Sequence, residues 1–366
     1  ATRAPRLKRA VPFHSRDNER RVHTGATEED EEKELAGATL GVAGDGDNGV
    51  SVAAHSGTAA KTGVQELLPR ESNYTGIPRI IHQSWKSSSA IPARFGPWMR
   101  SWTSAHPTWT YVFWTDADNL ALFETLYPQY LHVARGVGKI GLADMARYAL
   151  LHSVGGLYVD ADFECVQPLD KLLRDHELFL SSEPRAHTVL LEKSDSVSLC
   201  NALMASKPRH PLWLRLLDTI RVKFERESAR DPVGLTGPRI LNQTYFEYVS
   251  SDQNATTNTA TVLPPEFFYP EVAYWNIVSL ENACRSRSDA AAKTACAWLK
   301  QFPRGEFTNK THATHHWQCT WCNGDGADEY SSLESVFKGT RTVLHAPQIS
   351  KRGDGGGAIA FVPMSF

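Results

Sequence analysis

The sequence predicts a protein of the α/β class, in which a sheet with parallel strands is flanked by helices. From residue 74 onward, short apolar runs typical of strands alternate with longer segments of helical periodicity. The chain has 366 residues, of which 41% are apolar and 10% aromatic, so it can bury a sizeable core. No apolar run reaches the ~18 residues that a transmembrane helix needs.

Composition excludes several other classes of protein. The chain has 39 basic and 41 acidic residues, a formal net charge of −2, which gives no reason to expect nucleic acid or an anionic membrane as a partner. Collagen, a coiled coil and a wholly disordered chain are excluded as well. A globular, aromatic-rich enzyme or binding module remains.

We expect three regions along the chain. Residues 1–72 open with a basic stretch, continue with an acidic run and have no aromatic residue after Phe13. Such a segment cannot bury enough surface to offset its chain entropy, so it is predicted to be a flexible stem. Residues 73–350 are predicted to form one folded domain. Residues 351–366, where a glycine-rich run lies, are predicted to be a loose tail.

The first half of the folded domain contains two predicted strands, each followed by a helix. Residues 78–85 form a short apolar run after a turn, and aromatic residues recur at helical spacing over residues 95–102. A second strand is predicted over residues 109–114. The next helix begins at Asp116, with Asp and Asn residues as candidates for its cap.

The central block carries the most information. Residues 139–153 have helical periodicity, and two glycines end this helix. Residues 157–159 follow as a short apolar strand with acidic residues at its carboxyl end, where open α/β sheets bind their ligands. Further on, residues 178–180 are predicted as a strand and residues 211–227 as a helix.

Paired carboxylates separated by one residue suit a divalent cation that bridges a diphosphate, because hard cations prefer oxygen ligands. The chain contains three Asp-x-Asp pairs, at residues 45–47, 116–118 and 160–162. The first lies in the expected stem, and helix capping explains the second. Only Asp160 and Asp162 follow a buried strand, so we expect the chemistry there.

Asp144 and Arg147 lie one helical turn apart and so share a helix face. As a surface ion pair they would contribute only ~0.5 kcal/mol. Their helix, however, leads directly into the strand before Asp160. In that setting the carboxylate can accept sugar hydroxyls and the guanidinium can bind phosphate or sugar oxygens.

These segments resemble the sugar-binding region of glycosyltransferase family 32. The resemblance is carried by residues 143–148, Ala-Asp-Met-Ala-Arg-Tyr, and residues 155–162, Gly-Gly-Leu-Tyr-Val-Asp-Ala-Asp. The family includes fungal initiating α-1,6-mannosyltransferases and inositolphosphoceramide mannosyltransferases, and the glucosylating clostridial toxins share the arrangement. Shorter similarities occur at residues 77–85, 109–119, 236–238 and 315–317.

The resemblance implies a GT-A fold, a Rossmann-like mixed sheet flanked by helices, within a catalytic domain over residues 73–350. It implies metal-dependent, retaining transfer of a hexose, with mannose favoured, from a nucleotide sugar to a glycan or glycolipid acceptor. Asp160 and Asp162 would be the catalytic residues and would hold Mn²⁺ or Mg²⁺. The implied donor-binding residues are Trp85, Asp144, Arg147, Tyr148 and Gly156, with Trp85 either stacked on the base or simply part of the core.

Four further residues are candidates for the same site. His315 or His316 could complete the metal site, since imidazole is a common metal ligand, or both could be partly exposed loop residues. Gly237 and Glu183 are candidates for the acceptor side. For Gly237 the alternative is an ordinary turn.

Cysteines and glycosylation sequons favour the lumen of the secretory pathway, such as the Golgi. The N-x-Thr sequons are at Asn73, Asn242, Asn254 and Asn309. Cys284 and Cys296 could close a small loop as a disulfide, or they could be ordinary thiols. We expect membrane association only through a segment that this chain does not contain.

Two other functions compete with an active transferase. The first is an inactive GT-A module that binds nucleotide sugar or glycan, although it would have no use for Asp144, Arg147, Asp160 and Asp162 together. The second is a metal-dependent hydrolase, which would need a clustered His/Asp set that the sequence does not show.

Overall fold

A computed structural model of the chain describes residues 76–227, 231–251, 259–318, 320, 329–351 and 357–365. These residues belong to one unit, Lys61–Phe366. The expected stem, residues 1–72, lies outside the described residues. Within the described residues no helix is long and apolar enough to cross a membrane.

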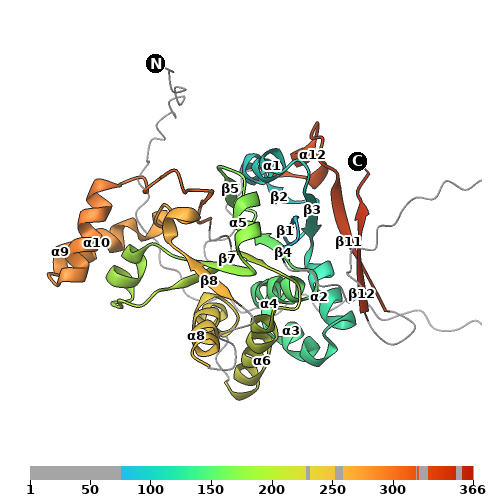
Figure 1. The fold of residues 1–366 in the computed structure, drawn as a ribbon, viewed down its shortest axis with the longest axis horizontal. Coiled ribbons are helices and arrows are strands. Elements are labelled where there is room, and N and C mark those ends of the chain that lie inside the picture. Colours follow the sequence, from blue (N-terminus) through green and yellow to red (C-terminus); the bar gives the residue numbers. More distant parts are fainter. Residues whose placement is uncertain are drawn as a thin grey trace, which may run out of the picture. The chain divides into compact units, whose positions relative to one another are not determined.

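An eight-stranded mixed sheet lies at the centre of the fold (Figure 1). Its order is β12-β11-β3-β1-β4-β7-β6-β8. The strands are β1 (Ile80–Ser84), β3 (Thr110–Trp114), β4 (Gly156–Val159), β6 (Leu178–Ser182), β7 (Leu199–Ser206), β8 (Ala260–Leu263), β11 (Leu344–Lys351) and β12 (Gly357–Pro363). β1 pairs in parallel with both β3 and β4, whereas β7 runs antiparallel to β4 and β6. The predicted α/β class is therefore confirmed.

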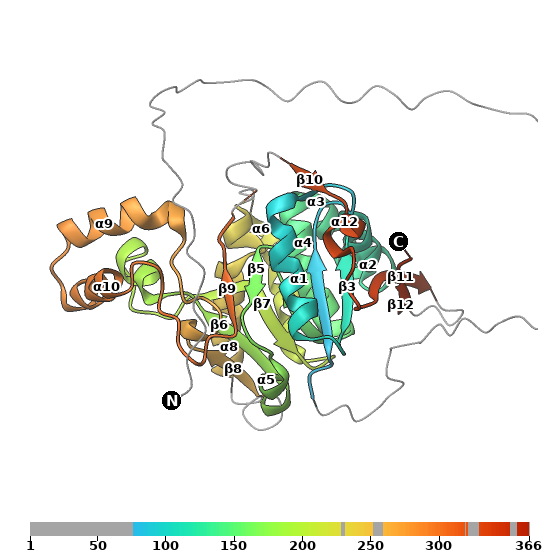
Figure 2. The same cartoon turned by 90° about the horizontal axis from the view of Figure 1, so that it is seen from above.

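Helices cover both faces of the sheet (Figures 1 and 2). One face packs against α2 (Asp116–Thr125), α3 (Leu131–Gly136), α4 (Gly138–Ser153), α6 (Pro211–Arg226) and α8 (Pro238–Val249). The other face packs against α1 (Gly96–Ala105), α5 (Asp170–Asp175), α12 (Leu333–Phe337) and a ribbon of β5 (Phe163–Cys165) with β9 (Ala313–His315). Short α7 (Pro232–Leu235) precedes α8, and β2 (Ile91–Pro92) pairs with β10 (Tyr330–Ser331).

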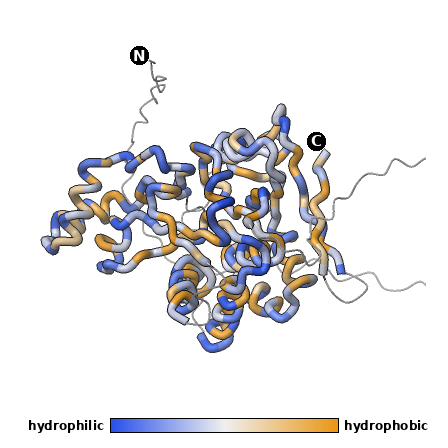
Figure 3. Tube along the Cα trace, in the orientation of Figure 1, coloured by the Kyte–Doolittle hydropathy of each residue, from blue (hydrophilic) through white to orange (hydrophobic). Residues whose placement is uncertain are grey.

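The amphipathic pattern of the helices follows from these two layers. In Figure 3 hydrophobic and hydrophilic residues alternate along the helices on either side of the sheet. In α1 the predicted aromatic face is the buried one, with Met99 and Trp102 fully enclosed beside Phe95. The helical spacing of these side chains directs them to one side of the helix, against the sheet.

The cap of α2 differs from the prediction. Thr115 is the N-cap residue: its hydroxyl accepts from the backbone N–H of Asp118, whose carboxylate accepts from the backbone N–H of Thr115. This capping box uses the second acid of the Asp116–Asp118 pair. Asp116, at the first helical position, is left to line the central cavity.

The C-terminal segment also differs from the prediction. The tail expected over residues 351–366 contains β12, which forms an antiparallel hairpin with β11 at the edge of the sheet. Ile359 and Phe361 are buried in the same core as Trp114. The glycines predicted a loose end, but the apolar side chains beyond them supply enough burial to hold a strand.

Helices α9 (Ile277–Ser286) and α10 (Ala290–Gln301) form a separate small cluster with the π-helix His187–Leu191. A disulfide joins Cys284 of α9 to Cys296 of α10, with 5.7 Å between their Cα atoms. The structure thus pairs the two cysteines that the sequence singled out. Two other cysteines that are close in the sequence, Cys319 and Cys322, lie outside the described residues.

We predict that Gly156→Ala destabilises the fold by about 3 kcal/mol or more, because two costs add. Gly156 has φ +104°, and an added Cβ would meet the carbonyl oxygen of Ile80 at 2.7 Å. Gly339 is the matched control, since it also has positive φ (+78°) but nothing within 4 Å of an added Cβ. Gly339→Ala should cost only about 1 kcal/mol in denaturant unfolding. Equal losses for the two variants would contradict this explanation.

We also predict that stability falls as the pH drops from about 6.5 towards 4. Burial lowers the pKa of His82, His152 and His210 from 6.5 to about 4 in each case. Each ring therefore takes up its proton more readily in the unfolded chain, and up to ~3 kcal/mol per ring is lost as the pH approaches the folded pKa. Thermal unfolding at a series of pH values checks the trend.

His82 gives the sharpest form of this test. Its Nδ1 accepts from the indole N–H of Trp114 at 3.1 Å and its Nε2 donates to the carbonyl oxygen of Gly155 at 2.9 Å, so only the neutral ring fits. His82→Gln should flatten the dependence of the unfolding free energy on pH. His132→Gln, at an exposed position, should leave that dependence unchanged. If His82→Gln loses as much unfolding free energy between pH 6.5 and 4 as the wild type, the role of His82 is refuted.

Candidate active site

The polar residues of the site gather at one edge of the sheet. β1, β3, β4 and β6 all point the same way, so their carboxyl ends meet at this edge, and antiparallel β7 begins there. The loops beyond these ends enclose a cavity of about 440 Å³. This volume lies within the range of small-molecule binding sites.

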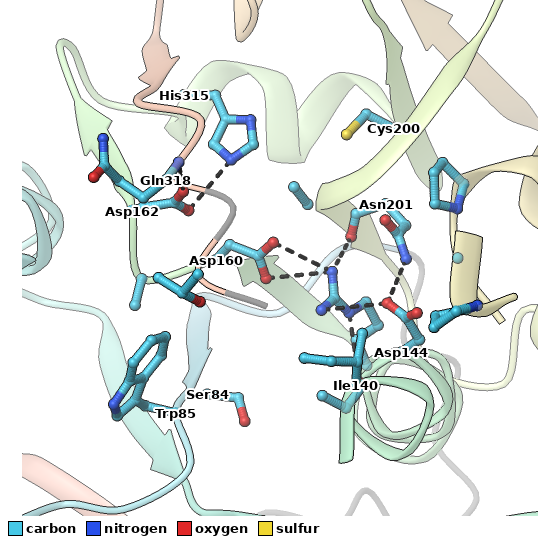
Figure 4. A pocket seen from close by; sticks show the side chains of 18 of the residues that line it. Ser84, Trp85, Ile140, Asp144, Asp160, Asp162, Cys200, Asn201, His315 and Gln318 are labelled. Atoms are coloured by element: carbon cyan, nitrogen blue, oxygen red, sulfur yellow. Dashed lines mark hydrogen bonds and ion pairs between the residues drawn. The ribbon is translucent and has the colours of Figure 1, made fainter. Parts of the chain in front are cut away.

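Arg147, on α4, carries a positive charge in the cavity wall and contacts Asp144, Asp160 and Asn201, whose positions Figure 4 shows. Its guanidinium lies 3.2 Å from a carboxylate oxygen of Asp160 and 3.5 Å from one of Asp144, and it donates to the backbone carbonyl of Asn201 at 2.9 Å. Its face also lies over the ring of Tyr158, 4.6 Å from the centroid. The side chain is only 9% exposed, so these contacts replace its hydration.

Asp144 is held by Asn201 and Thr236, two residues that the sequence did not place beside it. Its two carboxylate oxygens accept from Asn201 Nδ2 at 2.8 Å and from Thr236 Oγ1 at 2.9 Å. Burial raises the pKa of Asp144, while the charge of Arg147 and these two donors oppose the rise. Thr236 belongs to the segment 236–238 that the sequence had marked. No pattern marked Asn201, which lies on β7, 57 residues after Asp144.

Asp160 follows β4 directly and faces Arg147. Its carboxylate also accepts a 2.7 Å hydrogen bond from the hydroxyl of Tyr158. Burial raises the pKa of Asp160; Arg147 opposes this rise and the neighbouring charge of Asp162 adds to it. The first acid of the pair is therefore tied to the Arg147 network.

Asp162 is tied instead to the segment after β9. His315 Nε2 lies 3.2 Å from one of its oxygens, and the other accepts from the backbone N–H of Gln318 at 2.8 Å. Burial alone would raise the pKa of Asp162, but the charge and hydrogen bond of His315 and the N–H of Gln318 outweigh it and lower the pKa. The carboxylate is thus kept in its ionised form.

Asp160, Asp162 and His315 together form a set that fits a divalent metal ion. One ligand atom from each lies within 4.8 Å of the other two. Two carboxylates and an imidazole suit Mn²⁺ and similar ions. In addition, the buried Nδ1 of His315 has no hydrogen-bond partner among the described residues.

The structure separates the two histidines that the sequence grouped together. His316 Nε2 lies 3.0 Å from Glu164 Oε2, and its ring stacks on Trp98 with 4.0 Å between centroids. It does not reach the Asp160–Asp162 pair. Successive side chains leave an extended backbone on opposite sides, so only one of two adjacent histidines can face the cavity.

Two residues expected to bind the donor lie behind the cavity wall. Tyr148 is fully buried; its hydroxyl donates to the carbonyl of Thr236 and accepts from Asn201 Nδ2. Gly156 is a strand residue packed against Ile80, so its role is to allow close approach of backbone. Both residues shape the site without lining it.

The other candidates do line the cavity. Trp85 follows β1, and its indole N–H donates to the carbonyl of Ala90 at 2.8 Å. Gly237 and Glu183 line the cavity as well. Residues lining it that the sequence did not mark include Lys86, Lys139, Cys200, Trp275 and Gln318.

The predicted glycosylation sites fall in different settings. Asn309 is exposed in a turn, whereas Asn242 lies within α8 and its side-chain oxygen accepts from the backbone N–H of Leu199. Asn73 and Asn254 lie outside the described residues. Glycosylation stays a prediction at all four positions. Of the two described asparagines, Asn309 is the more exposed.

Residues 92–179 match a family described as the glycosyltransferase sugar-binding region containing a DXD motif. A mannosyl phosphorylinositol ceramide synthase of Saccharomyces cerevisiae is 29% identical over 194 residues, 52% of this chain and 48% of the relative. An initiation-specific α-1,6-mannosyltransferase of Candida albicans is 25% identical over 48% of this chain and 54% of the relative. The chain thus spans about half the length of the curated relatives that it matches.

Among solved structures, similar chains include a glycosyltransferase named PaToxG and the galactosyltransferase LgtC. The first is 13% identical with a TM-score of 0.38 and covers 64% of this chain and 82% of its own. The second is 12% identical with a TM-score of 0.37 and covers 72% of this chain and 97% of its own. These TM-scores carry no argument, and the order of the strands in the sheet defines the fold.

The two histidines provide a direct test of the metal site. We predict that Asp162→Asn and His315→Ala each raise the dissociation constant for Mn²⁺ at least ~10-fold, because each would remove a ligand from the candidate site. His316→Ala is the matched control and should change it less than ~2-fold, since this ring contacts Glu164 and Trp98 instead. Calorimetric titration or electron paramagnetic resonance of Mn²⁺ measures the affinity. Equal losses for both histidine variants would contradict the assignment.

Proposed function

We propose that this chain, whose residues 92–179 match the glycosyltransferase sugar-binding region with its DXD motif, is a metal-dependent transferase. It moves a hexose, most favourably mannose, from a nucleotide sugar to a hydroxyl of a glycan or glycolipid, with retention at the anomeric carbon. The observation that carries the proposal is the buried network in which Arg147 joins Asp144 to Asp160 at the cavity wall. Relatives named as mannosyltransferases support the choice of sugar.

The order of the strands suggests how a donor lies along the cavity. Trp85 and Asp116 follow β1 and β3, Asp160 follows the adjacent β4, and Asn201 lies on β7 beyond it. We place the nucleotide base against Trp85, the diphosphate beside Asp160 and Asp162, and the sugar against Asp144 and Asn201. The lysines Lys86 and Lys139 add positive charge to a cavity that would receive an anionic donor.

Each charged group then has a distinct task. Asp160, Asp162 and His315 would hold a divalent cation, which supplies compensation for negative charge on the leaving diphosphate. Asp144 is oriented by Asn201 and Thr236 and accepts hydrogen bonds from the sugar hydroxyls. Arg147 holds Asp144 and Asp160 at a fixed separation. The leaving phosphate itself takes the proton of the attacking hydroxyl, so no strong protein base is required.

The surroundings support the secretory pathway, such as the Golgi lumen, as the place of action. The disulfide between Cys284 and Cys296 persists in oxidising compartments. Asn309, in an Asn-Lys-Thr sequon, is exposed. A glycan or glycolipid acceptor belongs to the same compartment in this proposal.

The alternative is a module that binds a nucleotide sugar or glycan without turning it over, and one assay separates the two. The assay measures release of nucleoside diphosphate from GDP-mannose, UDP-glucose and UDP-galactose with Mn²⁺, with and without acceptor. We expect release that increases with acceptor. Binding of a donor without release would favour the module, and release without transferred product would favour a hydrolase.

We predict that Asp144→Asn lowers kcat/KM for the donor by about 100-fold, because the buried amide cannot pair with Arg147. Asp175→Asn, at an exposed position at the end of α5, is the matched control and should keep wild-type activity. Circular dichroism checks that both variants fold. A folded Asp144→Asn variant with full activity would refute the assigned donor site.

A further inference from the structure

We propose that the end of the cavity beyond β6 is a sugar-binding subsite for the acceptor, made by Glu183 and Trp275 and positioned by His187. This inference rests on the proposed function and adds to it the residues that select the acceptor. It depends on two hydrogen bonds that link the carboxylate of Glu183, the imidazole of His187 and the backbone N–H of Ala273. The proposed donor site does not use these groups.

Glu183 stands at the carboxyl end of β6, on the opposite side of β7 from β4. Its backbone N–H donates to the carbonyl of Ser198, which extends the pairing of β6 with β7 by one residue. Its side chain is 17% exposed and lines the cavity. Trp85 and Glu183 therefore follow strands separated by β4 and β7, so a group bound at Glu183 is remote from a base at Trp85.

His187 fixes the carboxylate of Glu183. Its Nδ1 lies 2.9 Å from Glu183 Oε2, and its Nε2 lies 3.0 Å from the backbone nitrogen of Ala273. The amide of Ala273 can only donate, so Nε2 accepts and Nδ1 carries the proton that it donates to Glu183. His187 is only 4% exposed and begins a π-helix, a conformation that is frequent at functional sites. One oxygen of Glu183 is thus committed to His187, and no hydrogen bond to its other oxygen occurs within the described residues.

The same histidine positions the aromatic part of the subsite. His187 accepts a hydrogen bond from the backbone N–H of Ala273, which comes two residues before Trp275. Trp275 lines the cavity and is 37% exposed. Trp275 stands edge-on to Trp317, another lining residue, with 6.2 Å between the ring centroids, and the ring of His187 lies 5.1 Å from that of Trp317. His187 therefore links the carboxylate to both indoles.

A carboxylate beside indole rings matches the chemistry of a sugar. The ring of a hexose offers an apolar C–H face and a set of hydroxyl donors. A charged carboxylate accepts strong hydrogen bonds from hydroxyls, and an indole offers a large, rigid apolar surface. The structure therefore points to a neutral, hydroxyl-rich acceptor ring at this end, in preference to an anionic group that Glu183 would repel.

The test measures sugar binding and transfer separately. Methyl α-mannoside and myo-inositol serve as probes, and their binding to the protein with GDP and Mn²⁺ is followed by ligand-observed NMR. We expect Glu183→Gln and Trp275→Ala to weaken probe binding by about 10-fold each, from loss of a charged hydrogen bond and of an apolar contact. Glu192→Gln and Phe246→Ala, both at exposed positions outside the cavity, are matched controls and should leave it unchanged.

Kinetics distinguish positioning from a merely structural role of His187. We expect His187→Ala to raise KM for the acceptor by about 10-fold while KM for the donor stays within ~2-fold, with His187→Asn, which keeps a donor for Glu183, intermediate. If His187→Ala fails to fold, Glu183→Gln and Trp275→Ala carry the test.

Two results would overturn the subsite: no binding of either probe to the wild type, or unchanged acceptor binding in both Glu183→Gln and Trp275→Ala. An equal rise in both KM values for His187→Ala would overturn the positioning role. Failure of the proposed function would look different, because the wild type would then release no nucleoside diphosphate from any donor, whatever the probes do.

Discussion

The buried guanidinium of Arg147 is the group on which the site depends. Arg147 lies on α4 and contacts Asp144 on the same helix, Asp160 after β4 and the backbone of Asn201 on β7. A charge withdrawn from water in this way costs several kcal/mol unless partners of opposite charge and good geometry surround it. The energetic need to satisfy one cation therefore fixes a helix and two strands relative to one another, and it sets the positions of the two carboxylates that face the cavity.

Packing behind the site makes this arrangement possible. The chain passes from α4 into β4 through Gly155 and Gly156, and an added Cβ at Gly156 would meet the backbone of β1. The neutral ring of His82 on β1 then bridges Gly155 and Trp114, which ties three adjacent strands together. The strand that leads to Asp160 needs glycine where it passes Ile80. Stability and function thus share one short segment.

Neighbouring residues in this chain often have unrelated tasks because the backbone sends them in different directions. Asp160 joins the Arg147 network, whereas Asp162 joins His315 and Gln318. His315 faces the acidic pair, whereas His316 stacks on Trp98. At the start of α2, Asp118 completes a capping box and Asp116 lines the cavity. Of the two histidines and of the Asp116–Asp118 pair only one member lines the cavity, whereas Asp160 and Asp162 both line it and differ in their partners.

The sequence by itself determined the α/β class, the main strands and helices before residue 230, and Asp144, Arg147, Asp160 and Asp162 as the candidate residues that the structure brings together. These features are local: apolar periodicity, a glycine pair and short spacings within one helix–strand unit encode them. Tertiary structure decided the rest. It placed Tyr148 and Gly156 behind the wall, it added β12 to the sheet edge, and it brought Asn201 to the cavity. It also brought Thr236 against Asp144 and Ala273 against His187, which holds Glu183. These hydrogen bonds join residues 57, 92 and 86 positions apart. Local patterns do not predict such pairings, because the partners meet only when the strands take their order in the sheet.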